Sequence, residues 1–257
     1  WFPYGHPESM TNEDIDLFKN NDIADYYFGE RELNSMKDFE EITKKKYNLI
    51  ANAADRTVHK KTKYNEKFDY DIIFIGAKLP KKKFFFENIL IPLSKKYNVG
   101  IFGPYWTLKD NSLRVITKYL RKFKFDKFNQ YLNDLRISIP YERERDYYFS
   151  SKICINFHEK ENITSHYHKI INQRTFKIAA CGGFQICDDI DNIHDYFSNE
   201  EIVTAKSIED WFEKIDYFIE NNKERNKIRE NSYVKCQENH MYEHRIQQIL
   251  KMNNLNY

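Results

Sequence analysis

Residues 173–189 read QRTFKIAACGGFQICDD, and this stretch decides the fold that the sequence predicts. Its first half, up to Ala180, predicts a helix whose small side chains let the backbone lie close to a neighbouring element. Gly182 or Gly183 can adopt the left-handed conformation that ends a helix. The four residues Phe184–Cys187 are short and apolar enough to form an interior strand. The stretch therefore predicts a helix, a sharp turn and a buried strand in direct succession.

The start of this predicted helix carries Arg174 and Thr175. A helix N-terminus offers free N–H groups and the positive end of the helix dipole to an anion. A guanidinium adds two parallel donors that suit phosphate. The pattern therefore favours a phosphate-binding site, although close helix–sheet packing with a surface arginine is the more frequent meaning of such a pattern.

The pattern Arg-x-Phe-x-x-x-Ala-Cys-Gly-Gly-Phe in residues 174–184, followed by Asp-Asp, resembles the donor-site segment of CgeB-like glycosyltransferases. These are a branch of the large group-1 family, which has the GT-B fold. His-x-Tyr-x-x-Arg in residues 240–245 is similar to the closing helix of that family, and Phe74-x-Gly76 to one of its strand ends. The resemblance runs in matching order from Tyr70 to Leu250.

The resemblance implies an α/β, GT-B-like protein. Residues 69–257 would form a Rossmann-like C-terminal domain with a parallel sheet that binds a nucleotide sugar and ends in the closing helix. Residues 58–68, which are polar and of mixed charge, would be the interdomain linker. Residues 1–57 alternate apolar strand-like and helical segments, as a parallel sheet requires, but are too short for a whole Rossmann-like domain. They would be the last portion of an N-terminal, acceptor-side domain.

The resemblance further implies a glycosyltransferase that uses a nucleotide-diphosphate sugar, with UDP as the expected nucleotide and an unknown glycan or protein acceptor. The family usually has Glu, the partner of the ribose hydroxyls, where this chain has Lys177, and an ammonium cannot accept their hydrogen bonds. We expect Arg174 and Lys177 to be catalytic by stabilising the departing diphosphate, without a metal ion or other cofactor. His6, in a Pro-rich loop, is a candidate on the acceptor side.

The predicted donor site combines strand ends, loops and the helix start. An apolar run over Tyr70–Lys78 ends in glycine, and ligands of open α/β sheets bind outside the carboxyl ends of strands. A short strand over Leu135–Tyr141 is expected to border the base. Hydroxyl, amide and guanidinium groups are the donors that a diphosphate needs. The predicted donor-binding residues are Gly76, Lys78, Gly103, Tyr141, Ser165, Asn172, Arg174, Thr175, Phe176, Lys177 and Gly182.

Composition narrows the class of protein. Hydrophobic residues make up 41% of the 257 residues and charged residues 31%, which is typical of a globular protein. The formal net charge of +2 argues against nucleic-acid binding by bulk electrostatics. The four cysteines show no CxxC pairing, and three lie in apolar runs, so we expect reduced thiols in the cytoplasm. The sequence shows no membrane span or signal peptide, and its start at Trp1 suggests a piece of a longer chain.

Two further clusters have alternative explanations. His158, His166 and His168 lie close in sequence, but their spacing is not a recognised zinc pattern, and no metal site is predicted. Residues 113–128 are basic and aromatic, which fits either a patch for an acidic acceptor or nucleic acid, or an ordinary solvated helix face.

Two alternatives to an enzyme stay open. Lys177 in place of glutamate, together with the short N-terminal portion, would suit a non-catalytic module that binds nucleotide sugars or glycans. A basic-helix interaction protein is the third interpretation, and the near-neutral charge counts against it.

Overall fold

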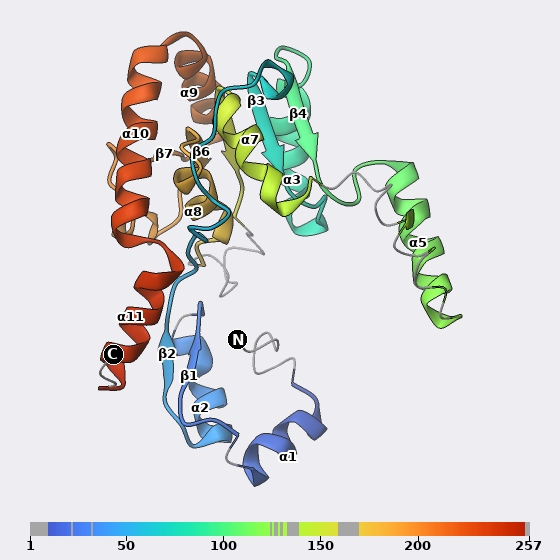
Figure 1. The fold of residues 1–257 in the computed structure, drawn as a ribbon, viewed down its shortest axis with the longest axis vertical. Coiled ribbons are helices and arrows are strands. Elements are labelled where there is room, and N and C mark those ends of the chain that lie inside the picture. The colour runs from blue at the N-terminus through green and yellow to red at the C-terminus, as the bar shows by residue number, and fades with distance from the viewer. Residues whose placement is uncertain are drawn as a thin grey trace.

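The computed structural model describes residues 10–21, 23–31, 33–123, 125, 128, 131–132, 139–158 and 170–254. It contains two parallel β-sheets, each accompanied by helices (Figure 1). The strands are β1 (Tyr27–Gly29), β2 (Tyr47–Leu49), β3 (Ile72–Ile75), β4 (Val99–Phe102), β5 (Ile153–Asn156), β6 (Gln185–Asp188) and β7 (Val203–Ala205). The α-helices are α1 (Asn12–Asn20), α2 (Lys37–Thr43), α3 (Lys83–Phe85), α4 (Ile91–Leu93), α5 (Leu108–Lys122), α7 (Glu144–Ser150), α8 (Gln173–Ala180), α9 (Ile208–Glu220), α10 (Asn222–Asn239) and α11 (Tyr242–Met252).

The smaller sheet pairs β1 with β2 in parallel, and α1 and α2 pack beside it. Thr11 caps α1 by accepting a hydrogen bond from the Asp14 N–H. An aromatic cluster forms the core of this part. Its buried members are Phe18, Tyr27, Met36, Phe39 and Tyr47.

The larger sheet has five parallel strands in the order β4-β3-β5-β6-β7. The chain builds β3 and β4 toward one edge and then crosses over to place β5, β6 and β7 on the other side of β3. The strand order therefore reverses between β3 and β5. In open α/β sheets this switch point leaves a crevice at the carboxyl ends of the two strands.

Side chains of the larger sheet alternate between two cores because successive residues of a strand point to opposite faces. Ile72 and Phe74 join the core under α4 and α9, whereas Ile73 and Ile75 join the core under α7 and α8. Both faces of the sheet are therefore covered, which explains why its strands read as continuous apolar runs.

The helical stretch after β3 is divided into α3, a π-helical turn (Phe86–Leu90) and α4. Pro92 lies in the first turn of α4, where its missing N–H is tolerated. The predicted strand Leu135–Tyr141 lies mostly outside the described residues, and Tyr141 begins a 3-10 turn (Tyr141–Arg143) instead. Three further 3-10 turns lie in the larger sheet's part of the chain, at Glu66–Phe68, Pro80–Lys82 and Ile193–Asp195, and one, Leu33–Met36, precedes α2.

The closing helix returns to the first part of the chain. Ala54 pairs with Met241, and the buried guanidinium of Arg245 donates to the carbonyl groups of Ala51 and Asn52. The polar segment after Ala54 is not fully solvated, because His59 and Phe68 are buried and Lys61 forms an ion pair with Glu230. These contacts tie the segment between the two sheets to the larger one.

All four cysteines are buried, and none of them forms a disulfide. Burial raises the pKa of Cys154 and of Cys236 to about 12, so both are neutral thiols that pack as small apolar groups. Among the helices of the described ranges, none has the length and apolar composition to cross a membrane.

Candidate functional site

The candidate site lies where the strand order reverses, at the carboxyl ends of β3 and β5. Gly76 directly follows β3, and helix α8 begins beside it. Asn172 caps α8, since its side chain accepts a hydrogen bond from the Thr175 N–H. Within the described part of the chain, the N–H groups of Gln173 and Arg174 donate no hydrogen bond, as expected in the first turn of a helix. The first turn of α8 therefore presents donors to this edge.

The Arg174 side chain reaches across to the end of β3. Its guanidinium carbon lies 5.1 Å from the centre of the Phe74 ring, and its Nη1 donates to Asn156 Oδ1 at 3.1 Å. A Cβ added to Gly76 would come within 2.4 Å of Arg174 Nη2. Glycine at position 76 is therefore what lets the cation lie against the strand end, and the structure brings these two predicted residues together.

The loop after β4 closes the other side of Gly76. Gly103 has a φ of +128°, and a Cβ at this position would lie 2.4 Å from the Gly76 carbonyl oxygen. Trp106 donates its indole N–H to the same carbonyl at 2.7 Å and packs on the Phe74 and Phe86 rings. Gly103 and Trp106 thus shape the strand end by packing and by one hydrogen bond.

A chain of buried hydrogen bonds connects α8 to β5 and β6. Asn156 accepts from Asn172 Nδ2 at 2.9 Å and donates to Thr175 Oγ1 at 2.9 Å. Thr175 Oγ1 lies 3.2 Å from His158 Nε2, and His158 Nδ1 lies 2.9 Å from Asp188 Oδ1. Asp188 also accepts from the backbone N–H of His158, which fixes the imidazole beside it.

This network fixes the orientation of the side chains at the site, and its hydroxyl group does not serve as a nucleophile. The Thr175 side chain is fully buried, so its hydroxyl serves the network and has no access to a ligand. Phe176 is likewise buried and packs on His240 and Phe197. Both side chains were predicted to bind the donor, and their inward orientation leaves only their backbone available for that role.

Lys177 and Glu144 form an ion pair on the side of α8 that faces α7, with 2.9 Å between Nζ and Oε2. The Lys177 ammonium also lies 4.2 Å from the centre of the Tyr141 ring. A carboxylate is therefore present beside this turn of α8, but it comes from Glu144 on another helix. The predicted residues Lys177 and Tyr141 are brought together here, one helical turn from Arg174.

His59 completes this side of the site and was missed by the sequence analysis. Its ring is fully buried and lies 4.9 Å from the Tyr141 ring. Burial, reinforced by the charge of Lys177, lowers the pKa of His59 to about 4. The neutral ring accepts from the Asp55 N–H at Nδ1, so its proton is on Nε2, which finds no hydrogen-bond partner among the described residues.

A second cation at the strand ends is Lys82. Its side chain is buried, and Nζ donates to the carbonyl group of Phe157, directly after β5, at 2.9 Å. Lys78, which was predicted for this role, is exposed, and its ammonium lies 5.6 Å from the Trp106 ring. Lys82 therefore lies at the end of β5, whereas Lys78 lies near Trp106, on the side of Gly76 where it was predicted.

Of the remaining predicted residues, Gly182 is described and lies apart from the helix start. Gly182 has a φ of +68° after the last turn of α8, as predicted for a helix stop, and lies at the opposite end of the helix from Arg174. Ser165 and His6 lie outside the described residues. So do His166 and His168, and in the described part of the chain no three potential metal ligands come together.

The smaller sheet contributes Glu30 to the opposite side of the helix start. Glu30 follows β1 and accepts a hydrogen bond from Asn52, whose amide also donates to the carbonyl group of Ile171 at 3.3 Å. Ile171 directly precedes the cap of α8. Strand ends of both sheets therefore meet near α8, and Glu30 is a carboxylate that the sequence analysis did not single out.

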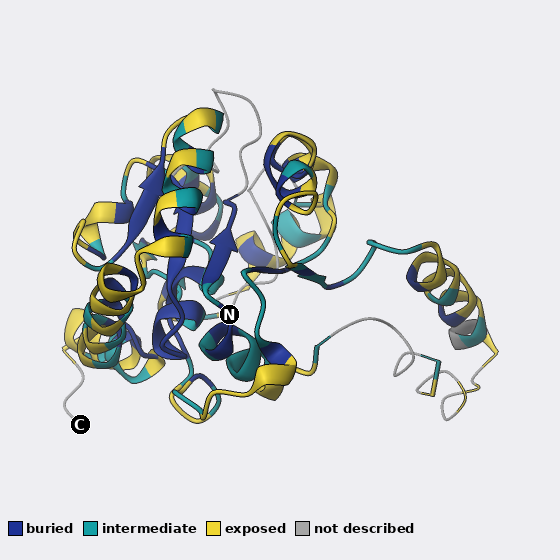
Figure 2. Ribbon diagram, turned by 90° about the horizontal axis from the view of Figure 1, so that it is seen from above, coloured by how far each residue is buried: buried dark blue, intermediate teal, exposed yellow. Residues whose placement is uncertain are grey.

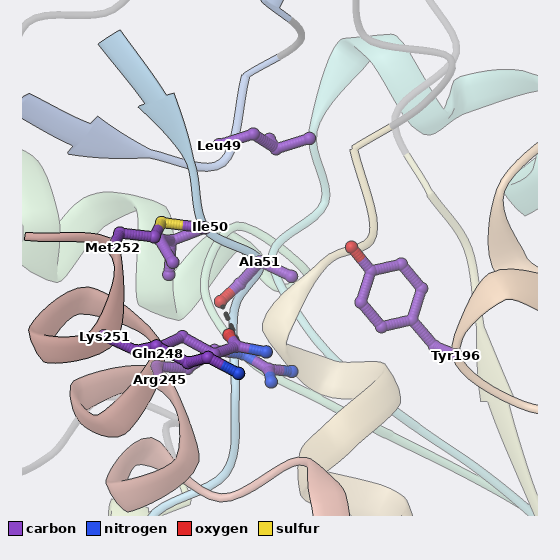
Figure 3. Close-up of a pocket in the computed structure, with 8 residues that line it drawn as sticks. All are labelled: Leu49, Ile50, Ala51, Tyr196, Arg245, Gln248, Lys251 and Met252. Atoms are coloured by element: carbon purple, nitrogen blue, oxygen red, sulfur yellow. Dashed lines mark hydrogen bonds between the residues drawn. The ribbon is translucent and has the colours of Figure 1, made fainter.

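A separate pocket of about 520 Å³ lies between the end of β2 and the closing helix (Figure 3). Tyr196 lies on one side of it and α11 on the other. None of the predicted site residues is among those that line it. The lining residues are Leu49, Ile50, Ala51, Tyr196, Arg245, Gln248, Lys251 and Met252.

Several solved structures share this fold. The chain is similar to sucrose-phosphate synthase from Thermosynechococcus elongatus, with a TM-score of 0.60 and 12% identity over 97% of this chain and 63% of that one. It is similar to HepE from Anabaena, solved with UDP and glucose, with a TM-score of 0.58 and 10% identity over 96% and 68%. An α-glucosyltransferase solved with UDP gives a TM-score of 0.62 and 12% identity over 96% and 71%.

These similarities establish the class of fold, and they confirm the prediction of an α/β protein with GT-B-like architecture. A family model described as glycosyl transferase-like matches residues 81–251, and the chain belongs to this family. The chain spans 63% of the sucrose-phosphate synthase structure. A search of curated proteins finds no match.

Proposed function

We propose that this protein transfers a sugar from a nucleotide-diphosphate donor, with UDP as the nucleotide, to an acceptor. The observation that carries the proposal is the position of Arg174, which holds a guanidinium against Gly76 where the strand order reverses. Membership of a glycosyl transferase-like family supports the reaction class. The UDP bound in the HepE and α-glucosyltransferase structures supports the choice of nucleotide.

The chemistry requires that the bond between the sugar and the diphosphate breaks while an acceptor hydroxyl attacks the sugar. Negative charge then grows on the diphosphate oxygen that leaves. Arg174 and the open N–H groups of the first turn of α8 lie where they would stabilise this charge, and a site already oriented by Asn156 loses little energy to reorganisation. Lys82, which is buried and bonded to the Phe157 carbonyl group, would add positive charge at the neighbouring strand end without touching the diphosphate. These cations would serve without a metal ion.

The remainder of the donor would extend from Arg174 along the side of α8 that carries Lys177. One helical turn is about 5.4 Å, which matches the step from a phosphate to the adjoining ribose. The Lys177–Glu144 pair and Tyr141 would then face the nucleoside. Glu30, on the other side of the helix start, is our candidate for the base that accepts the acceptor's proton, and His6 stays a prediction for that side.

Calorimetric titration of the chain with UDP, UDP-glucose, ADP and GDP tests the donor site. We expect UDP to bind more tightly than ADP or GDP. Arg174→Ala should weaken UDP binding about 10- to 100-fold, as expected when a hydrogen bond to a charged group is lost. Arg114→Ala, which removes an exposed guanidinium from α5, is the matched control and should leave UDP affinity unchanged. If no nucleotide or nucleotide sugar binds, the proposal is wrong.

A non-catalytic module that binds nucleotide sugars is the second candidate, and the Lys177–Glu144 pair is the observation that favours it. Hydrolysis and transfer assays with UDP-sugars distinguish the two. Binding of UDP-glucose without release of UDP, in the presence of a broad panel of glycan acceptors, would favour the module. Release of UDP that Arg174→Ala abolishes would favour the enzyme.

A further inference from the structure

Helix α5 stands apart from the rest of the molecule. It follows β4 and projects sideways, away from the larger sheet and the helices that cover it (Figures 1 and 2). Most of its residues are exposed. Because helices in globular proteins are usually stabilised by packing of an apolar face, a helix in this position needs another explanation.

One face of α5 is apolar and turned to solvent. Leu108, Val115 and Tyr119 are spaced by seven and four residues, which places them in one row along the helix. Their exposed fractions are 86%, 53% and 60%, and Ile116, beside the row, is 46% exposed. Phe123, at the end of the helix, continues the same face and is 68% exposed. We call these five residues the apolar row.

The opposite side of α5 carries the two buried residues of the helix whose side chains are described. Asp110 and Thr117 are buried, and seven residues separate them, so they lie in a row of their own. Asp110 accepts a hydrogen bond from the Tyr105 N–H at 2.7 Å, which fixes the start of the helix. The buried positions of α5 are therefore polar and its apolar row is exposed, which is the reverse of an ordinary surface helix.

Positive charge is concentrated on the same helix. Residues 108–122 contain five basic residues and one acidic residue, a formal charge of +4, whereas the whole chain carries +2. Among the described side chains, Lys109, Arg114 and Lys118 are exposed. Lys118 and Arg114 lie along one flank of the apolar row and Lys109 along the other.

We propose that α5 docks this protein on an anionic membrane surface, with the apolar row inserted among the lipids and the flanking cations against their headgroups. This is the chemistry by which amphipathic helices lie in a bilayer interface. A helix of 15 residues is about 22 Å long, which suits a position in the plane of the membrane. Exposed aromatic side chains after the helix, Phe125, Phe128 and Tyr131, belong to the residue types that favour this interface.

Charge and residue type exclude two other occupants. A nucleic acid duplex would meet the cations with its phosphates, but this charged outer surface would leave the aliphatic side chains of Leu108, Val115 and Ile116 exposed to water. A second copy of the chain, joined through the same row, would bring two cationic helices together and cost energy by like-charge repulsion. An anionic lipid surface satisfies both the apolar row and its cations.

Flotation of the whole chain with lipid vesicles tests the proposal. We expect it to bind vesicles of phosphatidylcholine with 30% phosphatidylglycerol, to bind phosphatidylcholine alone at least tenfold more weakly, and to lose binding as salt rises from 50 to 300 mM, because counterions screen the headgroup charge. The double variant Val115→Ser/Tyr119→Ser should lower the partition coefficient at least tenfold. Val234→Ser, the same change at a residue of α10 that is 44% exposed, should not.

The contribution of charge has its own variants. Arg114→Gln/Lys118→Gln should weaken binding to the anionic vesicles, whereas Lys223→Gln/Lys227→Gln on α10 removes the same charge and should have little effect. Circular dichroism and thermal melting establish that each variant is folded. The proposal is overturned if the chain binds neither vesicle, if the α5 variants bind like the wild type, or if α5 instead mediates retention on RNA or dimerisation.

Discussion

Helices α8 and α5 are both amphipathic, but they use their two kinds of side chain in opposite ways. In α8 the apolar residues Phe176, Ile178 and Ala179 are fully buried, and even the polar Thr175 is enclosed and hydrogen-bonded. In α5 the buried residues are the polar Asp110 and Thr117, and the apolar ones face solvent. Amphipathicity therefore does not by itself tell which face of a helix meets the protein.

The two helices therefore suit different functions. At the start of α8, the donors that would bind a ligand are held by partners from β5 and β6, so their positions are fixed before the ligand arrives. Along α5, the apolar side chains Leu108, Val115 and Ile116 are exposed, so this surface can meet something outside the chain. If burial decides how much each helix contributes to stability, substitutions in α8 and in α5 should change the free energy of unfolding by different amounts.

The same truncation in both helices should have very different effects on stability. Ile178→Ala removes a fully buried side chain that packs on Ile73 and Cys154, and should lower the free energy of unfolding by about 3 kcal/mol. Ile116→Ala removes a side chain that is 46% exposed and should change it by less than about 0.5 kcal/mol. Urea unfolding followed by circular dichroism measures both. Equal losses would mean that α5 is packed in solution, contrary to its exposed position here.

The fold could be predicted largely from local pattern. The βα alternation, the helix over residues 173–180 and the stop at Gly182 depend on periodicity and on backbone conformation, and both can be recognised in a short window. The approach of Arg174 to Gly76 could also be predicted from the sequence, because the carboxyl ends of parallel strands and the starts of the following helices lie at one edge of a sheet. The narrower CgeB-like assignment and the domain boundaries stay predictions.

Other parts of the site depend on partners distant in sequence. Lys177 meets Glu144 on a different helix, and no local pattern connects the two. His59 comes from a segment that reads as a polar linker, although its ring is fully buried. Residues 81–83 are three lysines in a row, and the structure buries only Lys82 of the three because its position on the turn faces β5. Tertiary packing, which a single sequence does not reveal, decides each of these cases.

The packing of α8 against the closing helix should make stability depend on pH. The His240 ring lies 5.4 Å from the Phe176 ring, accepts a hydrogen bond from Arg245 at Nδ1 and donates from Nε2 to the Tyr196 carbonyl. Burial, with the nearby charge of Arg245, lowers its pKa from 6.5 to about 4. The unfolded chain therefore takes up the proton first. This contribution to stability is complete above pH 6.5 and is lost as the pH falls toward 4.

Between pH 7 and pH 5, His240 should account for about 2 kcal/mol of lost stability, at about 1.4 kcal/mol per pH unit below 6.5. His240→Gln should be less stable at pH 7 but should lose about that much less over the same interval. Urea unfolding at several pH values gives the free energy of unfolding of both proteins. The carboxylates titrate in both, so their effect cancels when one curve is subtracted from the other. Parallel pH curves would show that the His240 pKa is not lowered in the folded protein.

The ion pair on the outer side of α8 should show the smallest effect of the three. Its partners, Lys177 and Glu144, are 12% and 14% exposed, so some contact with water weakens their coupling. Lys177→Glu places two carboxylates together and should lower the free energy of unfolding by about 1.5 kcal/mol, less than the loss of a fully buried partner. The exchange Lys177→Glu/Glu144→Lys should recover most of that loss, because it restores opposite charges in the same place. A double variant no more stable than Lys177→Glu would mean that the pair does not form, and α8 would then present an unpaired cation to the nucleoside side of the proposed donor site.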